Sequence, residues 1–237
     1  MVFVNLFLAR HGQTDANAQQ LLQGSGLNGP LSEVGRHQAC ALAEGLRNQE
    51  IDMVVASGLE RAIETARSVA KYHKDAPLTT DPRLNEISWG KMDGVSFVNA
   101  APVVDPVVSR WKSGDFDAKI EGGESPNDCR GRILAAIKDI LQEARAKGHR
   151  NVFVCMHGRV LRVLMSTLVD RDLRTMQRFS HTNCCYHQLR VDIDELDQDS
   201  SSATIVPEAL TFEAVRIDVR DHLEVLHLCR PEAVDRV

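Results

Sequence analysis

Cationic and imidazole side chains occur beside glycines in three segments, Arg10-His11-Gly12, Ser57-Gly58-Leu59-Glu60-Arg61 and His157-Gly158. One such segment alone means little, because a strand-end histidine is usually a hydrogen-bonded structural residue and an arginine in the first turn of a helix usually faces solvent. Two guanidinium groups and two imidazoles at one spot would repel one another unless an anion joined them. If the three segments meet, they predict an anion site of the kind that phosphoryl transfer requires.

The same residue types could transfer a phosphoryl group without a metal ion. A neutral imidazole is a nucleophile toward phosphorus, and neighbouring guanidinium groups disfavour its protonation. Cationic side chains could stabilise the equatorial oxygens of the phosphoryl group, a task that magnesium performs in many enzymes. We therefore take His11 as the candidate nucleophile and Arg10, Arg61 and His157 as the candidate phosphate-binding residues.

Each segment follows an apolar run that predicts a buried strand, and these runs are Val2 to Ala9, Asp52 to Ala56 and Asn151 to Met156. Apolar spacing and capping residues predict helices between them, over Ser32 to Asn48, Glu60 to His73 and Asp128 to Lys147. Strands that alternate with helices predict an α/β fold, a three-layer α/β/α sandwich with a mainly parallel central sheet. The carboxyl ends of parallel strands share one edge, where such folds bind ligands, so we expect the three segments to meet there.

The rest of the chain is assigned to the same domain, so that residues 1–237 form a single unit. A helix is expected over Leu161 to Leu168, and later strands over Cys184 to Val191, Thr211 to Val219 and Leu223 to Leu228. Residues 192–207 are rich in Asp, Glu, Gln and Ser, which predicts an exposed loop. Residues 96–123 contain prolines and glycines without a clear period, which predicts an irregular insertion that faces the substrate.

The composition excludes several classes of protein. With 237 residues, 43% hydrophobic and 26% charged, the chain is an ordinary globular protein. A net charge of −5 argues against binding to nucleic acid or to an anionic membrane surface. No apolar run approaches the roughly 20 residues of a membrane span, and no secretory signal is visible, so a cytoplasmic location is expected. The six cysteines and nine histidines show no metal-ligand spacing, which predicts free thiols, no metal and no cofactor.

The motifs resemble the histidine phosphatase superfamily, the fold group that includes cofactor-dependent phosphoglycerate mutases and small-molecule phosphatases. The similarity extends from about residue 3 to residue 190 and follows the family's order. The residues that carry it are Arg10-His11-Gly12-Gln13-Thr14 with Asn17, Gln23-Gly24, Pro30-Leu31-Ser32 with Gly35, Ser57 with Arg61-Ala62 and Thr65-Ala66, Leu84-Asn85-Glu86-Ile87 with Gly90 and Asp93-Gly94, Gly122-Gly123-Glu124-Ser125, and His157-Gly158.

The resemblance implies a phosphoglycerate mutase-like fold, a small phosphorylated substrate and further site residues. By resemblance, Glu86 donates a proton to the leaving alkoxide and then activates water against the phosphohistidine. Asn17 and Gln23 are expected to bind the phosphate or the substrate through hydrogen bonds, assisted by the backbone N–H of Gly158. Two positions depart from the family pattern, where the usual Glu is Gln13 and the usual Asp is Asn28. Both lie beside the expected chemistry, so they bear on substrate details.

Three functions remain open, led by a metal-independent phosphatase that forms a phosphohistidine. The first alternative is a cofactor-dependent phosphoglycerate mutase. Mutases similar to this family hold the glycerate carboxylate with a Tyr and a Lys at positions that are Trp89 and Phe97 here. The second alternative is a non-catalytic phospho-ligand-binding protein, against which the presence of Glu86 counts. A serine hydrolase based on Ser57 is disfavoured, because a glycine elbow is missing. The oligomeric state and the natural substrate stay open.

Overall fold

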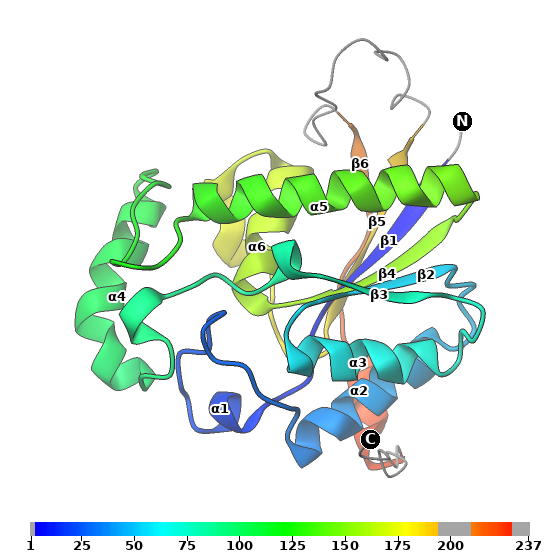
Figure 1. The fold of residues 1–237 in the computed structure, drawn as a ribbon, viewed down its shortest axis with the longest axis horizontal. Coiled ribbons are helices and arrows are strands. Elements are labelled where there is room, and N and C mark those ends of the chain that lie inside the picture. The colour runs from blue at the N-terminus through cyan, green and yellow to red at the C-terminus, as the bar shows by residue number, and fades with distance from the viewer. Residues whose placement is uncertain (1–2, 194–209, 229–237) are drawn as a thin grey trace.

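A six-stranded sheet forms the centre of the protein, seen in a computed structural model that describes residues 3–193 and 210–228 (Figure 1). The strand order is β3-β2-β4-β1-β5-β6. The first four strands in this order are mutually parallel, and β5 runs antiparallel to both β1 and β6. The strands are β1 (Phe3–Arg10), β2 (Met53–Ser57), β3 (Leu78–Asp81), β4 (Asn151–Met156), β5 (Tyr186–Asp192) and β6 (Phe212–Val219).

Helices cover both faces of the sheet and complete the expected three-layer sandwich. Helices α2 (Glu33–Leu46) and α3 (Glu60–Ala70) lie on one face, and α5 (Pro126–Lys147) and α6 (Gly158–Met165) lie on the other (Figure 1). Alternate residues of β1 serve the two cores, since Leu6 and Leu8 pack with α5 and α6 while Phe7 and Ala9 pack with α2 and α3. The mainly parallel α/β/α architecture expected from the sequence is thus confirmed.

Local capping signals explain where the covering helices begin and end. The Ser32 side chain accepts a hydrogen bond from the N–H of Gly35 at the start of α2. Ser125 and Asp128 form a capping box at the start of α5, with Pro126 in the first turn. The same helix ends at Gly148, whose φ of 72° is the left-handed conformation that favours glycine. The predicted bounds of α2 and α5 are correct to within two residues.

The prediction of an irregular insertion over residues 96–123 is wrong for the first half of this segment. Residues Phe97–Lys112 form helix α4, which lies beyond the end of the sheet at the left of Figure 1. Pro102 and Pro106 lie inside this helix and interrupt its backbone hydrogen bonds, which is why the sequence argued against it. The helix forms because one face, with Ala100, Val104 and Trp111, is buried in the core.

The strand expected over Leu223 to Leu228 is also wrong, because Asp221–Leu228 is a 3₁₀ helix, η7. A short run with mixed apolar spacing cannot distinguish the two states, and a turn from Arg220 to Leu223 starts the helix. The exposed loop expected over 192–207 lies outside the described residues beyond Ile193. Elements that the sequence analysis did not anticipate are β3, α1 (Asp15–Ala18), the 3₁₀ turns η1 (Pro82–Leu84), η2 (Gly90–Met92) and η4 (Leu173–Arg178), and the π turn η3 (Ser166–Asp170) that follows α6.

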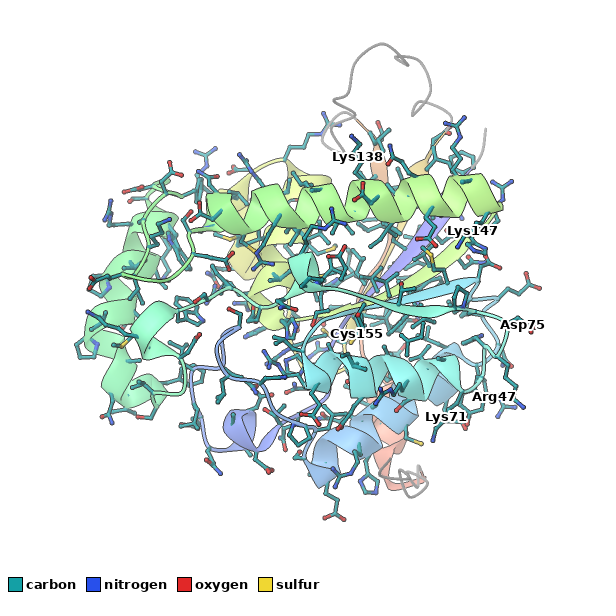
Figure 2. The ribbon with its side chains drawn as sticks, in the orientation of Figure 1. Arg47, Lys71, Asp75, Lys138, Lys147 and Cys155 are labelled. Atoms are coloured by element: carbon teal, nitrogen blue, oxygen red, sulfur yellow. The ribbon has the colours of Figure 1, made fainter. Side chains whose placement is uncertain are left out.

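No disulfide joins the cysteines within residues 3–193. Cys155 of β4 lies in the interior of the molecule, whereas Arg47 and Lys71 lie on its surface (Figure 2). Burial raises the pKa of the Cys155 thiol, so the group stays protonated and unreactive at neutral pH. Among the described helices, none combines the length and the apolar character needed to cross a membrane.

Candidate active site

The three motifs meet at one edge of the sheet. Strand β1 ends at Arg10, β2 ends at Ser57, and β4 ends at Met156, directly before His157. Arg10 lies opposite Met156 in the parallel pairing of β1 with β4, so both histidines emerge side by side. Their ring centroids are 5.0 Å apart at an interplanar angle of 54°. The convergence expected from the strand order is therefore present.

The hydrogen bonds of His11 fix its tautomer. Its Nδ1 lies 2.7 Å from the carbonyl oxygen of Gly12, and a carbonyl can only accept, so Nδ1 carries the proton. Burial lowers the pKa of His11 well below its usual 6.5, and the charges of Arg61 and Arg10 lower it further. The ring is therefore neutral at pH 7, with a lone pair on Nε2. A buried imidazole in this state is a competent nucleophile.

Arg61 and His157 are bound to each other at the second strand end. The Arg61 side chain is fully buried, and its Nε donates to Nδ1 of His157 at 3.2 Å. Since Nδ1 accepts, the neutral His157 ring carries its proton on Nε2, which donates to Oγ of Ser57 at 2.6 Å. Two backbone carbonyls, of Leu27 and Gly24, accept from the ends of the guanidinium at 2.8 and 3.4 Å. The protein therefore fixes the position of this arginine before any ligand binds.

The positive charge of the site comes from the two arginines. Burial lowers the pKa of His157 well below 6.5, and Arg61 lowers it further, so the ring adds no charge at pH 7. The sequence-based expectation gave His157 a share of that charge. Burial lowers the pKa of Arg61 to about 10, which leaves the group protonated. Arg10 donates from Nη1 to the carbonyl of His181, and its buried Nε has no hydrogen-bond partner among the described residues.

Glu86 lies at the amino terminus of α6, beside the arginines. Its carboxylate accepts from the backbone N–H of Arg159 and of Val160, both at 3.1 Å, and from its own neighbour Ile87 at 2.9 Å. A helix N-terminus favours a negative charge, which accounts for a nearly buried carboxylate at this place. The charge of Glu86 also offsets part of the lowering that burial causes in the pKa of Arg10 and of Arg61. An acid and two fixed cations thus share one site.

Arg132 of α5 anchors the segment that carries Glu86. Its guanidinium donates to the carbonyls of Arg83 and Asn85 at 2.7 Å each and to that of Glu86 at 3.3 Å. The same group forms a two-point ion pair with Glu124, with both N–O distances at 2.8 Å. Glu124 in turn accepts from the N–H of Ser88 at 3.0 Å. The Gly122-Gly123-Glu124-Ser125 motif therefore supports the acidic residue from behind.

Asn17 and Gln23 lie together on the loop that follows β1. The Gln23 Oε1 accepts from Nδ2 of Asn17 at 3.1 Å and from Oγ1 of Thr14 at 2.8 Å. Oδ1 of Asn17 accepts from Nδ2 of Asn183 at 3.3 Å, and the same Asn183 nitrogen donates to the carbonyl of His11 at 3.0 Å. These bonds occupy the side-chain amide oxygens of both Asn17 and Gln23.

Close backbone packing requires glycine at Gly12 and Gly35. A Cβ on Gly35 would lie 1.9 Å from the carbonyl oxygen of Gln13, and one on Gly12 would lie 2.5 Å from that of Gly35. The start of α2 is therefore in contact with the loop that carries His11. Of the two departures from the family pattern, Gln13 accepts from Ser32 Oγ at 3.1 Å, and Asn28 accepts from the N–H of Glu60 at the start of α3 at 2.9 Å. Both amides hold loops in position.

Sequence reasoning missed Arg159, His181 and Asn183. Arg159 directly follows His157-Gly158, so its position next to a motif was a signal that could have been used. Gly158 lies close to His181 and Arg10, since an added Cβ would lie 3.0 Å from the His181 ring and 3.3 Å from Arg10 Nε. His181 and Asn183 lie on an irregular segment before β5, where no pattern marks them.

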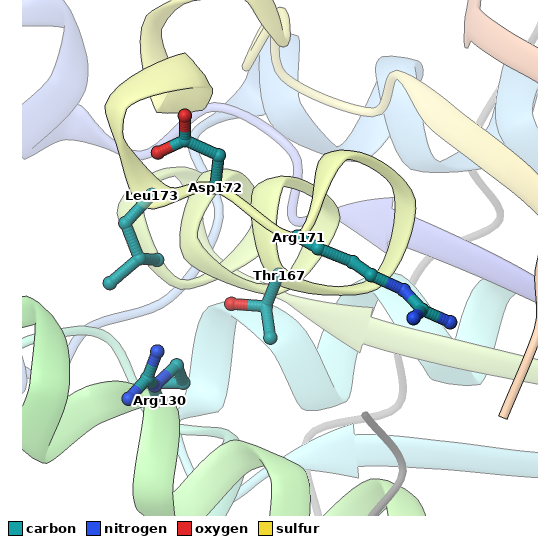
Figure 3. Close-up of a pocket in the computed structure, with 5 residues that line it drawn as sticks. All are labelled: Arg130, Thr167, Arg171, Asp172 and Leu173. Atoms are coloured by element: carbon teal, nitrogen blue, oxygen red, sulfur yellow. The ribbon is translucent and has the colours of Figure 1, made fainter. Parts of the chain in front are cut away.

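A separate cavity of about 210 Å³ lies at the end of α6, lined by Arg130, Thr167, Arg171, Asp172 and Leu173 (Figure 3). None of the predicted site residues lines it. The Asp172 carboxylate is bound to Arg174, and in Figure 3 the Arg171 side chain points away from Arg130. Within residues 3–193 and 210–228, no three His, Cys, Asp or Glu side chains are grouped so that they could hold a metal ion.

Comparison with known proteins agrees with the motifs. A sequence model of the histidine phosphatase superfamily (branch 1) matches residues 6–201. The probable phosphoglycerate mutase GpmB of Yersinia pestis (strain Pestoides F) is 32% identical over 195 residues, which cover 81% of this chain and 86% of that protein.

Solved structures show the same fold. One, mycobacterial glucosyl-3-phosphoglycerate phosphatase Rv2419c with VO3, has a TM-score of 0.76 at 24% identity and covers 92% of this chain and 100% of that one. A putative alpha-ribazole-5'-P phosphatase from Escherichia coli str. K-12 substr. MG1655 has a TM-score of 0.70 at 25% identity and covers 92% and 97%. Because the family match spans most of the chain, and because its motif residues meet at one edge of the sheet, this chain belongs to the histidine phosphatase superfamily (branch 1).

Proposed function

We propose that the protein hydrolyses phosphomonoesters of small molecules through a phosphohistidine on His11, without a metal ion or cofactor. The observation that carries this proposal is the state of His11. Its Nδ1 proton is held by the Gly12 carbonyl, and its ring is kept neutral by burial and by two arginines. This arrangement leaves Nε2 as the nucleophilic atom.

The first step transfers the phosphoryl group to the enzyme. Nε2 of His11 forms a bond to phosphorus while the bond from phosphorus to the ester oxygen breaks. Glu86 must be in its protonated form for this step, and it gives that proton to the oxygen, so the product leaves as a neutral alcohol. Arg10 and Arg61 stabilise the negative charge on the three equatorial oxygens. His157 holds Arg61 in position through its Nδ1.

The second step releases phosphate. Glu86, now a carboxylate, takes a proton from water as the water oxygen attacks the phosphohistidine. The bond from nitrogen to phosphorus breaks, and His11 returns to its neutral form. We assign the remaining contacts to the phosphate or the substrate to Asn17, Gln23 and the N–H of Gly158 at the start of α6.

A phosphoglycerate mutase is the second candidate, favoured by the 32% identical relative that bears that name. A mutase must hold the glycerate carboxylate while the phosphoryl group returns to it. At the two positions where similar mutases use Tyr and Lys, this chain has Trp89, packed against Trp111 with ring centroids 5.5 Å apart, and Phe97, which is 52% exposed. Neither side chain is a cation, so we expect water to accept the phosphoryl group.

Quenching during turnover with a labelled phosphomonoester tests the proposal. The label should appear on His11 in a bond that is labile to acid and stable to base, and His11→Ala should lose both label and activity. Label on a serine or an aspartate would contradict the mechanism. Steady release of phosphate is expected, with slow or absent interconversion of 2- and 3-phosphoglycerate even when 2,3-bisphosphoglycerate is added. Fast interconversion with negligible phosphate release would favour the mutase.

Two further expectations stay proposals. We infer a single domain over residues 1–237, supported by a sheet that draws its strands from both ends of the described chain. We also infer a cytoplasmic location, supported by the lack of a membrane-spanning helix among the described residues.

A further inference from the structure

One guanidinium next to the site is not needed by the steps above. Arg159 lies in the first turn of α6, and its Cζ is 5.7 Å from the centroid of the Trp89 ring and 5.6 Å from that of Trp111. The two ring centroids are 5.5 Å from each other, so both rings lie on one side of the group, and such cation–π contacts use no N–H donor. Nη1 is buried and has no hydrogen-bond partner among the described residues.

No carboxylate pairs with this side chain in the described structure. Glu86 is the carboxylate whose charge acts on Arg159, but its oxygens are bound by backbone N–H groups, including that of Arg159 itself. Other cations lie nearby. The pKa of His181 is lowered to about 3, first by burial and then by the charges of Arg10, Arg162 and Arg159. A buried guanidinium with an open N–H edge and cationic neighbours favours an anionic partner, because leaving such a charge unpaired is costly.

The partner is best explained as part of the substrate. Arg162, one turn further along α6, is already bound to the carbonyl of Phe179 and to Gln177, both at 2.9 Å. By contrast, Nη1 of Arg159 has no hydrogen-bond partner within residues 3–193 and 210–228. Glu86, the proposed proton donor to the leaving oxygen, is the carboxylate whose charge acts on the Arg159 guanidinium, so this guanidinium lies near the place where the alcohol part of the ester would leave.

We propose that Arg159 binds a second negatively charged group, a carboxylate or a phosphate, on the alcohol part of the substrate. This inference rests on the proposed function and narrows its substrate class to phosphomonoesters with an anionic tail. Trp89 and Trp111 lie on one side of the guanidinium and leave its other side for that tail. The tail adds a charge-assisted hydrogen bond, which an ester with a neutral tail lacks.

Three esters on the same three-carbon chain test the proposal: 3-hydroxypropyl phosphate, 3-phosphonooxypropanoate and the symmetric propane-1,3-diyl bisphosphate. They differ at the far end, which is neutral, a carboxylate or a phosphate. The same end groups on a six-carbon chain test the reach of the site. We expect kcat/KM to be about 10- to 100-fold higher for at least one anionic ester than for its neutral counterpart. The preferred end group identifies the kind of anion.

Arg159→Met should lower kcat/KM for the anionic ester by about 10- to 100-fold and change that for the neutral ester by less than about 3-fold. Arg159→Lys, which keeps the charge, should recover part of the preference. The control is Arg178→Met, which removes an arginine that also lies over an aromatic ring, Phe179 at 4.6 Å, but is exposed and paired with Asp170. This control should keep the preference of the unchanged protein.

Equal turnover of neutral and anionic esters by the unchanged protein would overturn the inference. So would an equal loss on both esters in the Arg159 variants, which would mean that the residue only positions Glu86. Calorimetry on His11→Ala, which cannot turn over substrate, separates this inference from the proposed function. Preferential binding of the anionic ester, lost in His11→Ala/Arg159→Met, would support the tail site even if the protein hydrolysed none of the esters. A mutase acceptor also carries a carboxylate. The comparison of phosphate release with interconversion of 2- and 3-phosphoglycerate therefore still decides between hydrolysis and isomerisation.

Discussion

A histidine can attack phosphorus only while its ring is neutral, and the surroundings of His11 keep it in that state. The Gly12 carbonyl binds the proton on Nδ1, burial disfavours the charged ring, and Arg10 and Arg61 repel a further proton. The same arginines attract the phosphate that the ring attacks. The two functions of the arginines therefore depend on one arrangement, in which His157 holds Arg61.

Glu86→Gln should affect substrates according to their leaving groups. An amide cannot protonate a departing alkoxide, so hydrolysis of alkyl phosphates should fall by about 10²- to 10⁴-fold. An aryl phosphate such as p-nitrophenyl phosphate needs less help, so its phosphorylation step should be less affected, as single-turnover kinetics with both substrates would measure. Glu143→Gln is the control, because Glu143 forms an exposed ion pair with Lys147 on α5 and its loss should change neither substrate. Equal, small losses for Glu86→Gln would assign the proton to another group.

Exhaustive chelation should leave activity unchanged, because Arg10 and Arg61 supply the positive charge that a metal ion would otherwise provide. Phosphate release after dialysis against EDTA measures this. Arg61→Met is the matched comparison and should reduce kcat by about 10²-fold or more, the scale seen when a preorganised charge-stabilising donor is removed. Activity that disappears with EDTA and returns with magnesium or zinc would contradict the proposed site.

At the scale of elements, the site depends on helix ends and on a long helix behind them. The first turn of α6 binds Glu86, the start of α2 packs on the His11 loop, and α5 contributes Arg132. A misplacement of about 1 Å in a reacting group can cost about 10²-fold in rate. Residues that touch no substrate can therefore limit activity here.

Arg132→Met should reduce both activity and stability. It removes a donor from three backbone carbonyls and from the Glu124 carboxylate, so we expect the free energy of unfolding to fall by about 2–3 kcal/mol. Release of the Glu86 segment should lower kcat for alkyl phosphates by about 10- to 100-fold. Urea unfolding and steady-state kinetics measure the two effects. Arg110→Met removes the exposed ion pair with Asp115 and should cost less than about 1 kcal/mol without changing kcat. A similar result for both variants would refute the anchoring role.

The whole molecule should lose stability in acid, because it buries neutral histidines. Burial lowers the pKa of His187 to about 4, and its Nδ1 accepts from the N–H of Asp218 at 3.1 Å, which requires a neutral ring. An unfolded histidine has a pKa near 6.5, so between pH 6.5 and 4 the unfolded chain binds a proton that the folded protein does not. The contribution of His187 to the free energy of unfolding is therefore at its full value above pH 6.5 and falls as the pH is lowered toward 4.

The size of this effect is about 1.4 kcal/mol per pH unit for each such histidine, and urea unfolding at a series of pH values measures it. His187→Asn keeps an acceptor for the Asp218 N–H but cannot titrate. Unfolding of this variant should therefore take up about one proton fewer, so its free energy of unfolding should depend less steeply on pH than that of the unchanged protein. A free energy of unfolding that is flat between pH 6.5 and 4.5 in the unchanged protein would contradict the prediction.

Where the fold follows from local rules, the sequence predicted it well. Apolar runs that end at polar residues gave the strands β1, β2 and β4, and capping residues such as Ser32 and Gly148 gave the helix ends. Local rules failed where tertiary packing overrode them. Helix α4 contains two prolines and still forms, because Trp111 and its neighbours on that face are buried. The apolar spacing of residues 223–228 was compatible with two states, and the structure has the helical one.

The sequence by itself also determined that the three motifs share one edge, because the ends of neighbouring parallel strands must lie together. It could not determine the contacts made by side chains from distant irregular segments. The carboxylate of Glu86 meets backbone groups 73 and 74 residues away, and Arg132 reaches the same segment from 46 to 49 residues away. Arg159 meets Trp89 and Trp111 in the same way. Periodicity fixes which face of an element a residue occupies, but only the packing of elements against one another fixes which side chains and backbone groups then meet.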